Sequence, residues 1–464
     1  MKHSSFTPRK FLCRLLLACL TVVLLSSGVR SQENLDAGRR DPRIASVLMR
    51  ISPSRMQATI EKLVSFQTRS TLSTQDSASI AAGKGIGAAR EWIKSEFESY
   101  ARDCGGCLDV RTDTFTDGPA DRIPYPTEIS NVYAVLKGSD PQRSQRIVLV
   151  SGHYDSRNSD TLDASGAAPG ANDDASGTAV SLECARVLSQ LKFPATIIFL
   201  TVAGEEQGLN GSRHFAKTAK AAGWDIEAVL NNDIVGGDRS AQQDTSVLRV
   251  FSEGVPVVAT DADLRLIRSL GGESDSPSRE LARYIAQVGR SYDVGVKPLL
   301  VFRLDRYLRG GDHLSFNQQG YPAVRFTEFL EDYRHQHQNV RTENGIEYGD
   351  LPKFVNFDYL ANVARLNAAT LASLASAPAP PAKVRLLIKQ LENTSTLDWE
   401  PSPGATAYEV LWRATTSPEW GHLQTAGNAT QITIPMSKDN VIFAVRAVDE
   451  GGHRSLPVVP LPER

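Results

Sequence analysis

Net charge, cysteine and long apolar runs are all scarce in this sequence. The 464 residues contain 51 Lys and Arg against 53 Asp and Glu, which gives a formal net charge of −2. A chain so near neutrality gives no reason to expect nucleic acid or an anionic membrane surface as a partner. The sequence contains no internal repeat, and its hydrophobic content of 41% is enough for a real core. The length therefore predicts a globular protein of two or three domains, without setting its oligomeric state.

The one pronounced apolar run, Leu15–Leu25, lies close to the N-terminus and follows a basic start. It is too short to span a bilayer, and small residues follow it. We therefore expect residues 1–31 to be a secretory signal peptide, whose removal leaves an exported protein, periplasmic or extracellular, with no membrane association. Cys19 stands in a lipoprotein-like box, but the apolar run continues past it, which favours an ordinary secretory signal.

Only three cysteines remain after the predicted signal peptide. Cys104 and Cys107 are separated by two glycines and could close a small disulfide in an oxidising compartment. A zinc ion at this pair would need further Cys or His ligands nearby, and the local sequence offers none. Cys184 falls within an apolar helical pattern, which predicts a small buried side chain.

Strand and helix patterns alternate over most of the chain. Runs such as Arg146–Gly152 and Ala195–Ala203 are typical of buried strands, and Ile86–Tyr100 is typical of an amphipathic helix. This alternation predicts an α/β fold, a three-layer α/β/α sandwich with a mixed central sheet, over residues 32–376. The insert at residues 240–307 contains one expected helix, within residues 266–290, and is expected to shape the specificity pocket.

The last part of the chain has a different pattern. Residues 377–382 are rich in Pro and Ala and are typical of a linker. Residues 383–464 then consist of short alternating strands without a helix, which predicts a small all-β sandwich. Trp399, Tyr408–Arg413 and Phe443–His453 resemble a fibronectin type III domain, and we expect an accessory role for it.

Polar residues follow the ends of several predicted strands. His153 ends one strand, Asp173 closes the next loop, Glu205 and Glu206 follow the central buried strand, and Asp233 follows the next. Taken singly, each acid is an ordinary helix cap or a solvated side chain, and His153 is an ordinary surface or core histidine. Taken together, they should meet, because ligands of an open α/β sheet gather at the carboxyl ends of its strands.

This set lacks a second imidazole, for which His313, His335 and His337 are candidates. Two histidines and three carboxylates would be enough for two divalent ions that share a carboxylate, and N and O ligands without Cys suit catalytic zinc. Two ions can acidify a bridging water, but a proton carrier that is not a ligand is still required. The adjacent glutamates can supply one ligand and one proton carrier.

Here the sequence resembles the secreted di-zinc aminopeptidases of the bacterial leucyl aminopeptidase type, which are related to glutamate carboxypeptidases and glutaminyl cyclases. The matching motifs occur in the family's order between about residues 51 and 376. They are Gly152–Ser156, Pro169–Gly177, Gly204–Leu209, Asn232–Asp233 and Gly311–Phe316.

The resemblance implies a role for each matching residue. His153 and Asp233 would bind one zinc ion, Asp173 would bridge both, and Glu206 would bind the second. Glu205 would be the general base and then the general acid.

The resemblance also implies an orienting residue, a cis peptide bond and a fifth ligand. Asp155 would orient His153, and a cis peptide bond would join Asp173 to Asp174. In the family the fifth ligand is a His followed four residues later by Asp. His335 has Asn339 at that offset, so the resemblance favours His335, although the Asp is replaced.

The function that follows is removal of N-terminal residues from peptide substrates by a two-zinc enzyme. The alternatives are a glutaminyl cyclase, a glutamate-type carboxypeptidase and an inactive receptor-like protein on the same fold. The complete ligand set favours a hydrolase, because the cyclases keep one zinc ion and an inactive protein should have lost ligands.

Overall fold

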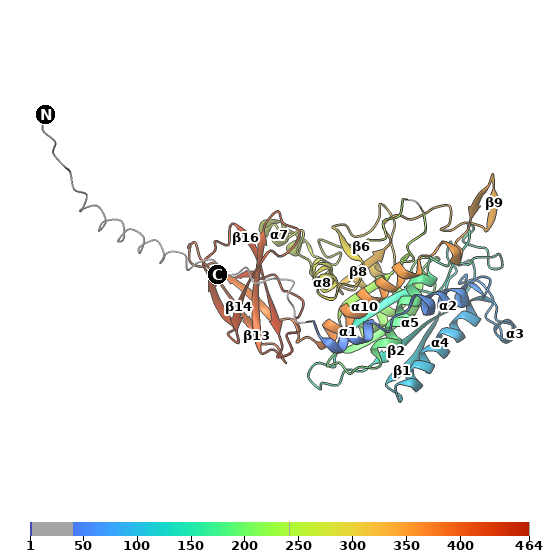
Figure 1. The fold of residues 1–464 in the computed structure, drawn as a ribbon, viewed down its shortest axis with the longest axis horizontal. Coiled ribbons are helices and arrows are strands. Elements are labelled where there is room, and N and C mark those ends of the chain that lie inside the picture. The colour runs from blue at the N-terminus through green and yellow to red at the C-terminus, as the bar shows by residue number, and fades with distance from the viewer. Residues whose placement is uncertain (2–39, 241, 464) are drawn as a thin grey trace. The chain divides into compact units, whose positions relative to one another are not determined.

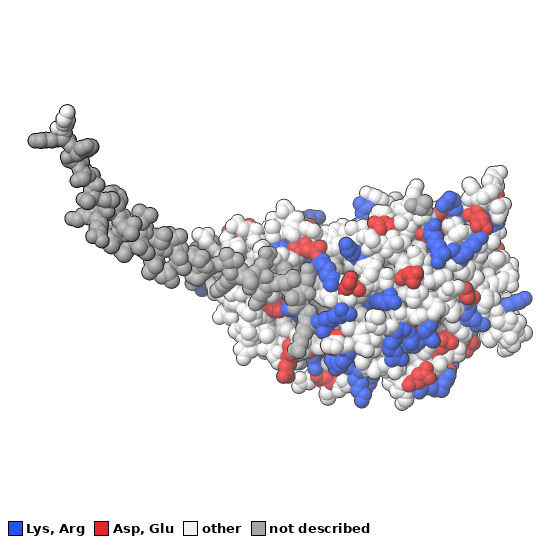
Figure 2. Space-filling view, viewed as in Figure 1, with Lys and Arg blue, Asp and Glu red and all other residues white. Residues whose placement is uncertain are grey.

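The computed structural model describes residues 1, 40–240 and 242–463. Apart from Met1, the predicted signal peptide lies outside the described residues. Within the described ranges, no helix is both long enough and apolar enough to cross a membrane. Lys and Arg are interspersed with Asp and Glu over the described residues of the face shown in Figure 2, in keeping with the small net charge.

A mixed sheet of eight strands runs through the larger part of the described chain, in the order β1-β2-β4-β3-β5-β8-β6-β7. The strands β4, β3, β5 and β8 lie next to one another and run parallel, and β2 and β6 flank them in the antiparallel sense. The carboxyl ends of the parallel strands therefore meet at one edge. The bounds are β1 Leu108–Asp117, β2 Thr127–Leu136, β3 Arg146–His153, β4 Thr196–Val202, β5 Asp225–Asn232, β6 Val247–Ser252, β7 Lys297–Val301 and β8 Ala323–Thr327.

Helices cover both faces of this sheet, which confirms the predicted three-layer α/β/α sandwich. One face packs against α1 Pro42–Leu48, α2 Pro53–Val64, α4 Gly85–Asp103, α5 Ala175–Leu188, α8 Pro277–Tyr292 and α10 Phe357–Ser376. In Figure 1, α2, α5 and α10 lie side by side across it. The other face packs against α6 Asn210–Ala221 and α9 His313–Asn317, through side chains such as Phe215 and Phe316.

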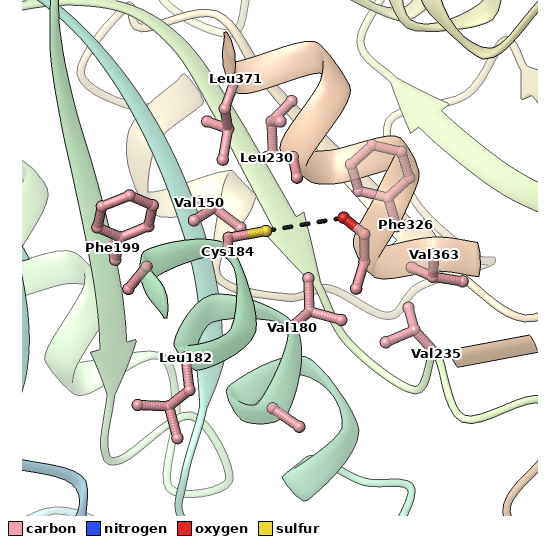
Figure 3. Packing of buried hydrophobic residues seen from close by; sticks show 14 of the residues in the cluster. Val150, Val180, Leu182, Cys184, Phe199, Leu230, Val235, Phe326, Val363 and Leu371 are labelled. Carbon is pink, nitrogen blue, oxygen red and sulfur yellow. Dashed lines mark hydrogen bonds between the residues drawn. The ribbon is translucent and has the colours of Figure 1, made fainter. Parts of the chain in front are cut away.

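The helix α5 lies deep in the larger layer. Its sequence is rich in small residues, and 13 of its 14 residues are buried. Cys184 of α5 is fully buried among aliphatic side chains, as predicted, with its Sγ directed toward the Ala364 carbonyl of α10 at 3.8 Å (Figure 3). Gly152 of β3 permits the close approach of α5, because a Cβ there would lie 2.3 Å from the carbonyl carbon of Gly177. This approach brings the N-terminus of α5 to the end of β3.

The insert contains more regular structure than the sequence predicted. It holds the strands β6 and β7, and two helices replace the one expected within residues 266–290, α7 Asp261–Leu270 and α8. The break has a local cause, because Gly271 ends α7 in the left-handed region at φ +66° and Ser276 caps the next helix before Pro277. Further short elements are α3 Ser77–Ala81, η1 Pro352–Phe354 and the hairpin of β9 Arg341–Glu343 and β10 Ile346–Tyr348.

Between α4 and β1, Cys104 and Cys107 form a disulfide, as the sequence suggested. It closes the turn that connects the end of α4 to the first strand of the sheet.

The last part of the chain is the predicted small β-sandwich. One sheet has the order β15-β12-β11-β17 and the other β14-β13-β16. Trp399, Tyr408 and Phe443 lie in the core between the two sheets. The indole N–H of Trp420 donates to Glu280 of α8 at 2.8 Å, and this hydrogen bond joins the β-sandwich to a helix that packs on the eight-stranded sheet. The bounds are β11 Ala382–Leu387, β12 Ser395–Glu400, β13 Ala407–Ala414, β14 His422–Gly427, β15 Gln431–Ile434, β16 Val441–Val448 and β17 Leu461–Glu463.

Candidate metal centre

The polar residues singled out in the sequence lie at the edge where the parallel strands end. His153 is the last residue of β3, Asp233 directly follows β5, and Glu205 and Glu206 follow β4. The loop before α5 brings Asp173 to the same edge. Because β4, β3 and β5 are neighbours in the sheet, side chains far apart in the sequence become adjacent in space.

Two groups of potential metal ligands form there, and Asp173 belongs to both. In the first, His153 Nε2 lies 3.2 Å from Asp173 Oδ1 and 4.0 Å from Asp233 Oδ1. In the second, His337 Nε2 lies 2.8 Å from Asp173 Oδ2 and 3.0 Å from Glu206 Oε1. Each oxygen of the Asp173 carboxylate therefore faces a different group, which is the arrangement of a bridging ligand.

These groups fit a pair of divalent cations. Among the described residues, the Nε2 atoms of His153 and His337 and Oε1 of Glu206 are buried and make no hydrogen bond, although they lie close to one another or to Asp173. Buried polar atoms are costly without a partner, and a cation between them would supply one. Imidazole nitrogens and carboxylate oxygens without thiolates are the ligand types of catalytic zinc sites.

Despite burial, the negative charge of the carboxylates in these two groups raises the pKa values of the two imidazoles. Burial lowers the pKa of His337, but the carboxylates of Glu206 and Asp173 outweigh it and raise this pKa to about 10. Burial likewise opposes charge on His153, and its acidic neighbours, led by Asp174, still raise its pKa well above the usual range. The cluster thus attracts a positive charge, which a metal ion would supply in place of the protons.

His335, which the resemblance favours as the fifth ligand, lies in neither of these two groups and belongs with Asp238 and Asp332 to a third group of potential ligands. Its Nδ1 lies 2.5 Å from Oδ2 of Asp238, and its ring stacks on Phe354 at a centroid distance of 3.7 Å. His337, two residues later, turns toward Asp173 with its backbone in the left-handed region at φ +55°. Asn339, at the offset where the family has Asp, instead accepts hydrogen bonds from Ser159.

Asp155 contacts both His153 and the glutamate pair. The Nδ1 of His153 lies 3.1 Å from the main-chain oxygen of Asp155 and 3.4 Å from its Oδ1. The carboxylate also accepts the backbone N–H groups of Glu205 at 3.3 Å and Glu206 at 3.2 Å. The residue expected to orient His153 is therefore also an anchor for the Glu205–Glu206 turn.

Two further acids fix the loop that carries Asp173. Asp174 caps α5 through the N–H of Gly177 at 2.9 Å and accepts the N–H of His153 at 3.0 Å. The peptide bond between Asp173 and Asp174 is cis, as the resemblance implied. Asp350, which the sequence did not single out, accepts the N–H groups of Asn172 and Asp173 at 2.7–2.9 Å.

Arg325, which the sequence did not single out, contacts a proposed ligand, with its NH2 3.1 Å from Asp233 Oδ1. Two further side chains without a sequence signal also contact proposed ligands. Gln336 Nε2 donates to Asp173 Oδ2 at 2.9 Å. The Arg157 Nε lies 3.0 Å from Glu206 Oε2, and its NH2 lies 2.6 Å from Nδ1 of His337. No motif marks either residue, although Arg157 lies only four positions after His153.

Glu205 belongs to neither ligand group and is half-buried. Burial, with the nearby carboxylates of Asp233, Glu206 and Asp312, raises the pKa of Glu205 well above its usual range. A carboxyl group of raised pKa beside the candidate centre can both accept and deliver a proton. His313 is buried and belongs to neither group, and its Nε2 lies 3.0 Å from the Leu304 carbonyl.

Comparisons with known proteins agree on one family. Residues 131–356 match the model of the family described as "Peptidase family M28". A "Probable zinc metalloprotease" from Pyrenophora tritici-repentis is 46% identical over 430 residues, 91% of this chain and 87% of the relative. Another from Pyricularia oryzae is 45% identical over 441 residues, 93% of this chain and 86% of the relative.

The LapA aminopeptidase of Legionella pneumophila has a similar fold, with a TM-score of 0.52 at 22% identity, over 73% of this chain and 76% of LapA. The similarity to these two relatives extends over 91% and 93% of this chain, and the residues matched by the family model include the strand ends that form the candidate centre. The chain belongs to peptidase family M28.

Proposed function

We propose that the protein is an aminopeptidase that holds two zinc ions and removes N-terminal residues from peptides. The observation that carries the proposal is the position of Asp173, whose two carboxylate oxygens face separate His–carboxylate groups. Relatives at 46% and 45% identity are named probable zinc metalloproteases, which supports the choice of metal. The presence of two imidazoles and three carboxylates supports hydrolysis over the single-zinc chemistry of a cyclase.

In this proposal His153 and Asp233 would hold one ion, Glu206 and His337 would hold the other, and Asp173 would contribute to both sites. When bound, the ions would supply an acidified water and stabilise charge on the substrate carbonyl.

Glu205 takes the proton from the attacking water and returns it to the leaving amine. Its raised pKa suits both directions of transfer. Asp155 positions this carboxyl by accepting the N–H of Glu205 and of the next residue.

Kinetics on paired substrates test this function. The purified full-length chain, with its zinc content measured in parallel, is assayed on leucyl-p-nitroanilide, on free and N-acetylated dipeptides, and on peptides that begin with Gln. We expect cleavage of free N-termini and none of the acetylated peptides. Cleavage of acetylated peptides would favour a carboxypeptidase. Pyroglutamate formation without cleavage would favour a cyclase, and zinc-bound protein that does neither would favour a binding role.

We also propose that the protein is exported and that its β-sandwich is a fibronectin type III-like accessory domain. The apolar run before residue 31 and the disulfide between Cys104 and Cys107 support export. The contact between Trp420 and Glu280 supports a stabilising role for the sandwich.

A further inference from the structure

We propose that the open side of the metal centre is a carboxylate-binding subsite built on Arg157 and Arg309. Preferred substrates would then be peptides that carry a carboxylate close to the bond that is cleaved. This inference rests on the proposed peptidase function and adds a substrate class to it.

The subsite is a hollow that adjoins the proposed ligand His337. It is lined by Arg157, Arg309, Tyr333, Gln336, His337 and Gln338. His337 is shared between the hollow and the second ligand group, so a peptide at the centre can extend into the hollow. None of these six lining residues is acidic. With the imidazole neutral as a ligand, the two guanidinium groups are the formal charges of this lining.

Arg157 is paired with groups that a metal ion would also use. Its Nε lies 3.0 Å from Glu206 Oε2, and its side chain is 17% exposed. A cation held by Glu206 takes up the charge of that carboxylate. Arg157 is then left with less counter-charge, next to the place where substrate binds, and its planar fork suits a carboxylate.

Arg309 is one of three arginines that contact the same carboxylate, so this cluster carries more positive than negative charge. Glu331, whose side chain is almost fully buried, lies within 3.0 Å of Arg249, Arg306 and Arg309. Three guanidinium groups share this carboxylate, although Arg306 also contacts Asp305 at 3.1 Å. Arg309 is the most exposed of the three, at 34%, and is the one that lines the hollow. Its charge is therefore available to an incoming anion.

The exposed ring of Tyr333 adds an apolar surface beside this charge. The guanidinium carbon of Arg309 lies 5.9 Å from its centroid. A cationic wall with an aromatic side and neutral amides attracts anionic substrates and disfavours cationic ones. The carboxylate can come from an acidic side chain or from the free C-terminus of a short peptide, since both present the same two oxygens to an arginine.

A small peptide panel separates these sources. The zinc-loaded full-length protein is assayed on Leu-Glu, Leu-Gln and Leu-Lys, each as the free acid and as the C-terminal amide, and on glutamyl- and leucyl-p-nitroanilide. We expect kcat/KM to be about tenfold higher with the favoured carboxylate, the size of one charge-assisted hydrogen bond. A preference for Glu among the amides or nitroanilides assigns the side chain, and a preference for acids over amides assigns the C-terminus.

Equal rates across the panel would overturn the subsite and leave the peptidase function intact. Zinc-bound protein that cleaves none of these peptides would overturn both, so the two failures are distinguishable.

Substitution of Arg309 tests whether the preference for carboxylate substrates comes from the hollow. Arg309→Gln should bring the ratio of carboxylate to neutral substrate close to one, mainly through KM, and Arg309→Glu should favour Leu-Lys amide over Leu-Glu amide. The matched control is Arg303→Gln, because Arg303 lies six residues before Arg309, packs over Tyr307 and does not line the hollow. Zinc content is measured for each variant. If Arg303→Gln lowers the ratio as much as Arg309→Gln, the preference reflects overall charge and the subsite is wrong.

Discussion

The two halves of the candidate metal centre are held in place by different kinds of structure. His153 ends a strand and Asp233 directly follows one, and the His153 side chain is 1% exposed. In the other half, His337 comes from the long connection between β8 and β9 and is 22% exposed. The first half is part of the sheet edge, whereas the second depends on how one loop folds back over that edge.

The partners of the two imidazoles differ in the same way. Nδ1 of His153 faces the main-chain oxygen of Asp155, an acceptor that leaves Nε2 free for a metal. Nδ1 of His337 faces the Arg157 guanidinium, which is a donor and a positive charge. Each half has a guanidinium beside a proposed ligand, since Arg325 NH2 lies 3.1 Å from Asp233 Oδ1. The two halves therefore differ mainly in how the imidazole is held, and we infer that the loop-built half is the adjustable one.

The largest effect is expected at the residue that joins the two halves. Asp173→Ala should lose both metal equivalents and reduce kcat/KM at least roughly a thousandfold, since both ions lose a shared ligand. Metal analysis and kinetics on leucyl-p-nitroanilide measure this. Retention of both ions in this variant would contradict a bridging role.

A change at Glu205 should separate catalysis from metal binding. Glu205→Gln removes the proton carrier but no proposed ligand, so activity should fall about 10²- to 10⁴-fold while the zinc content stays unchanged. The matched control is Glu206→Gln, which should lose one metal equivalent. If Glu205→Gln loses metal and Glu206→Gln does not, the two roles are reversed.

The loop-built half can be tested alone through two neighbouring histidines. His337→Ala should lose one metal equivalent, because its Nε2 lies 2.8 and 3.0 Å from two other proposed ligands. His335→Ala should retain both equivalents, because its imidazole contacts Asp238. Loss of an equivalent from the His335 variant would restore the assignment made from the sequence.

The smallest effect is a pH dependence of metal binding at the same half. Without metal, burial lowers the pKa of His337 but its acidic neighbours raise it to about 10, so the imidazole is protonated at pH 6–8 and must lose its proton to bind an ion. Metal affinity should therefore rise with pH, by about tenfold per unit for each proton displaced. Chelator competition between pH 6 and 8 measures this, and an affinity independent of pH would contradict it.

The sequence predicted the strand-built half and not the whole of the other. His153, Asp173, Glu206 and Asp233 were predictable because each follows a strand or precedes a helix, and the parallel order of the strands then brings them together. The choice between His335 and His337 as the fifth ligand could not be made from the sequence, because no strand or helix fixes the direction of either imidazole.

The direction of that loop depends on tertiary contacts. The φ of His337 and the pairing of His335 with Asp238 decide it. Arg157 and Asp350 were missed because a single polar residue in a loop has no pattern to distinguish it. The strands β6 and β7 were also missed, because they are short and lie between irregular segments of the insert.

The most direct measurement is an anomalous difference map, at the zinc absorption edge, of crystals of the zinc-loaded protein. We expect two peaks about 3.5–4 Å apart on either side of Asp173, one beside His153 and Asp233 and the other beside Glu206 and His337. A single peak, or a second peak at His335, would contradict this expectation.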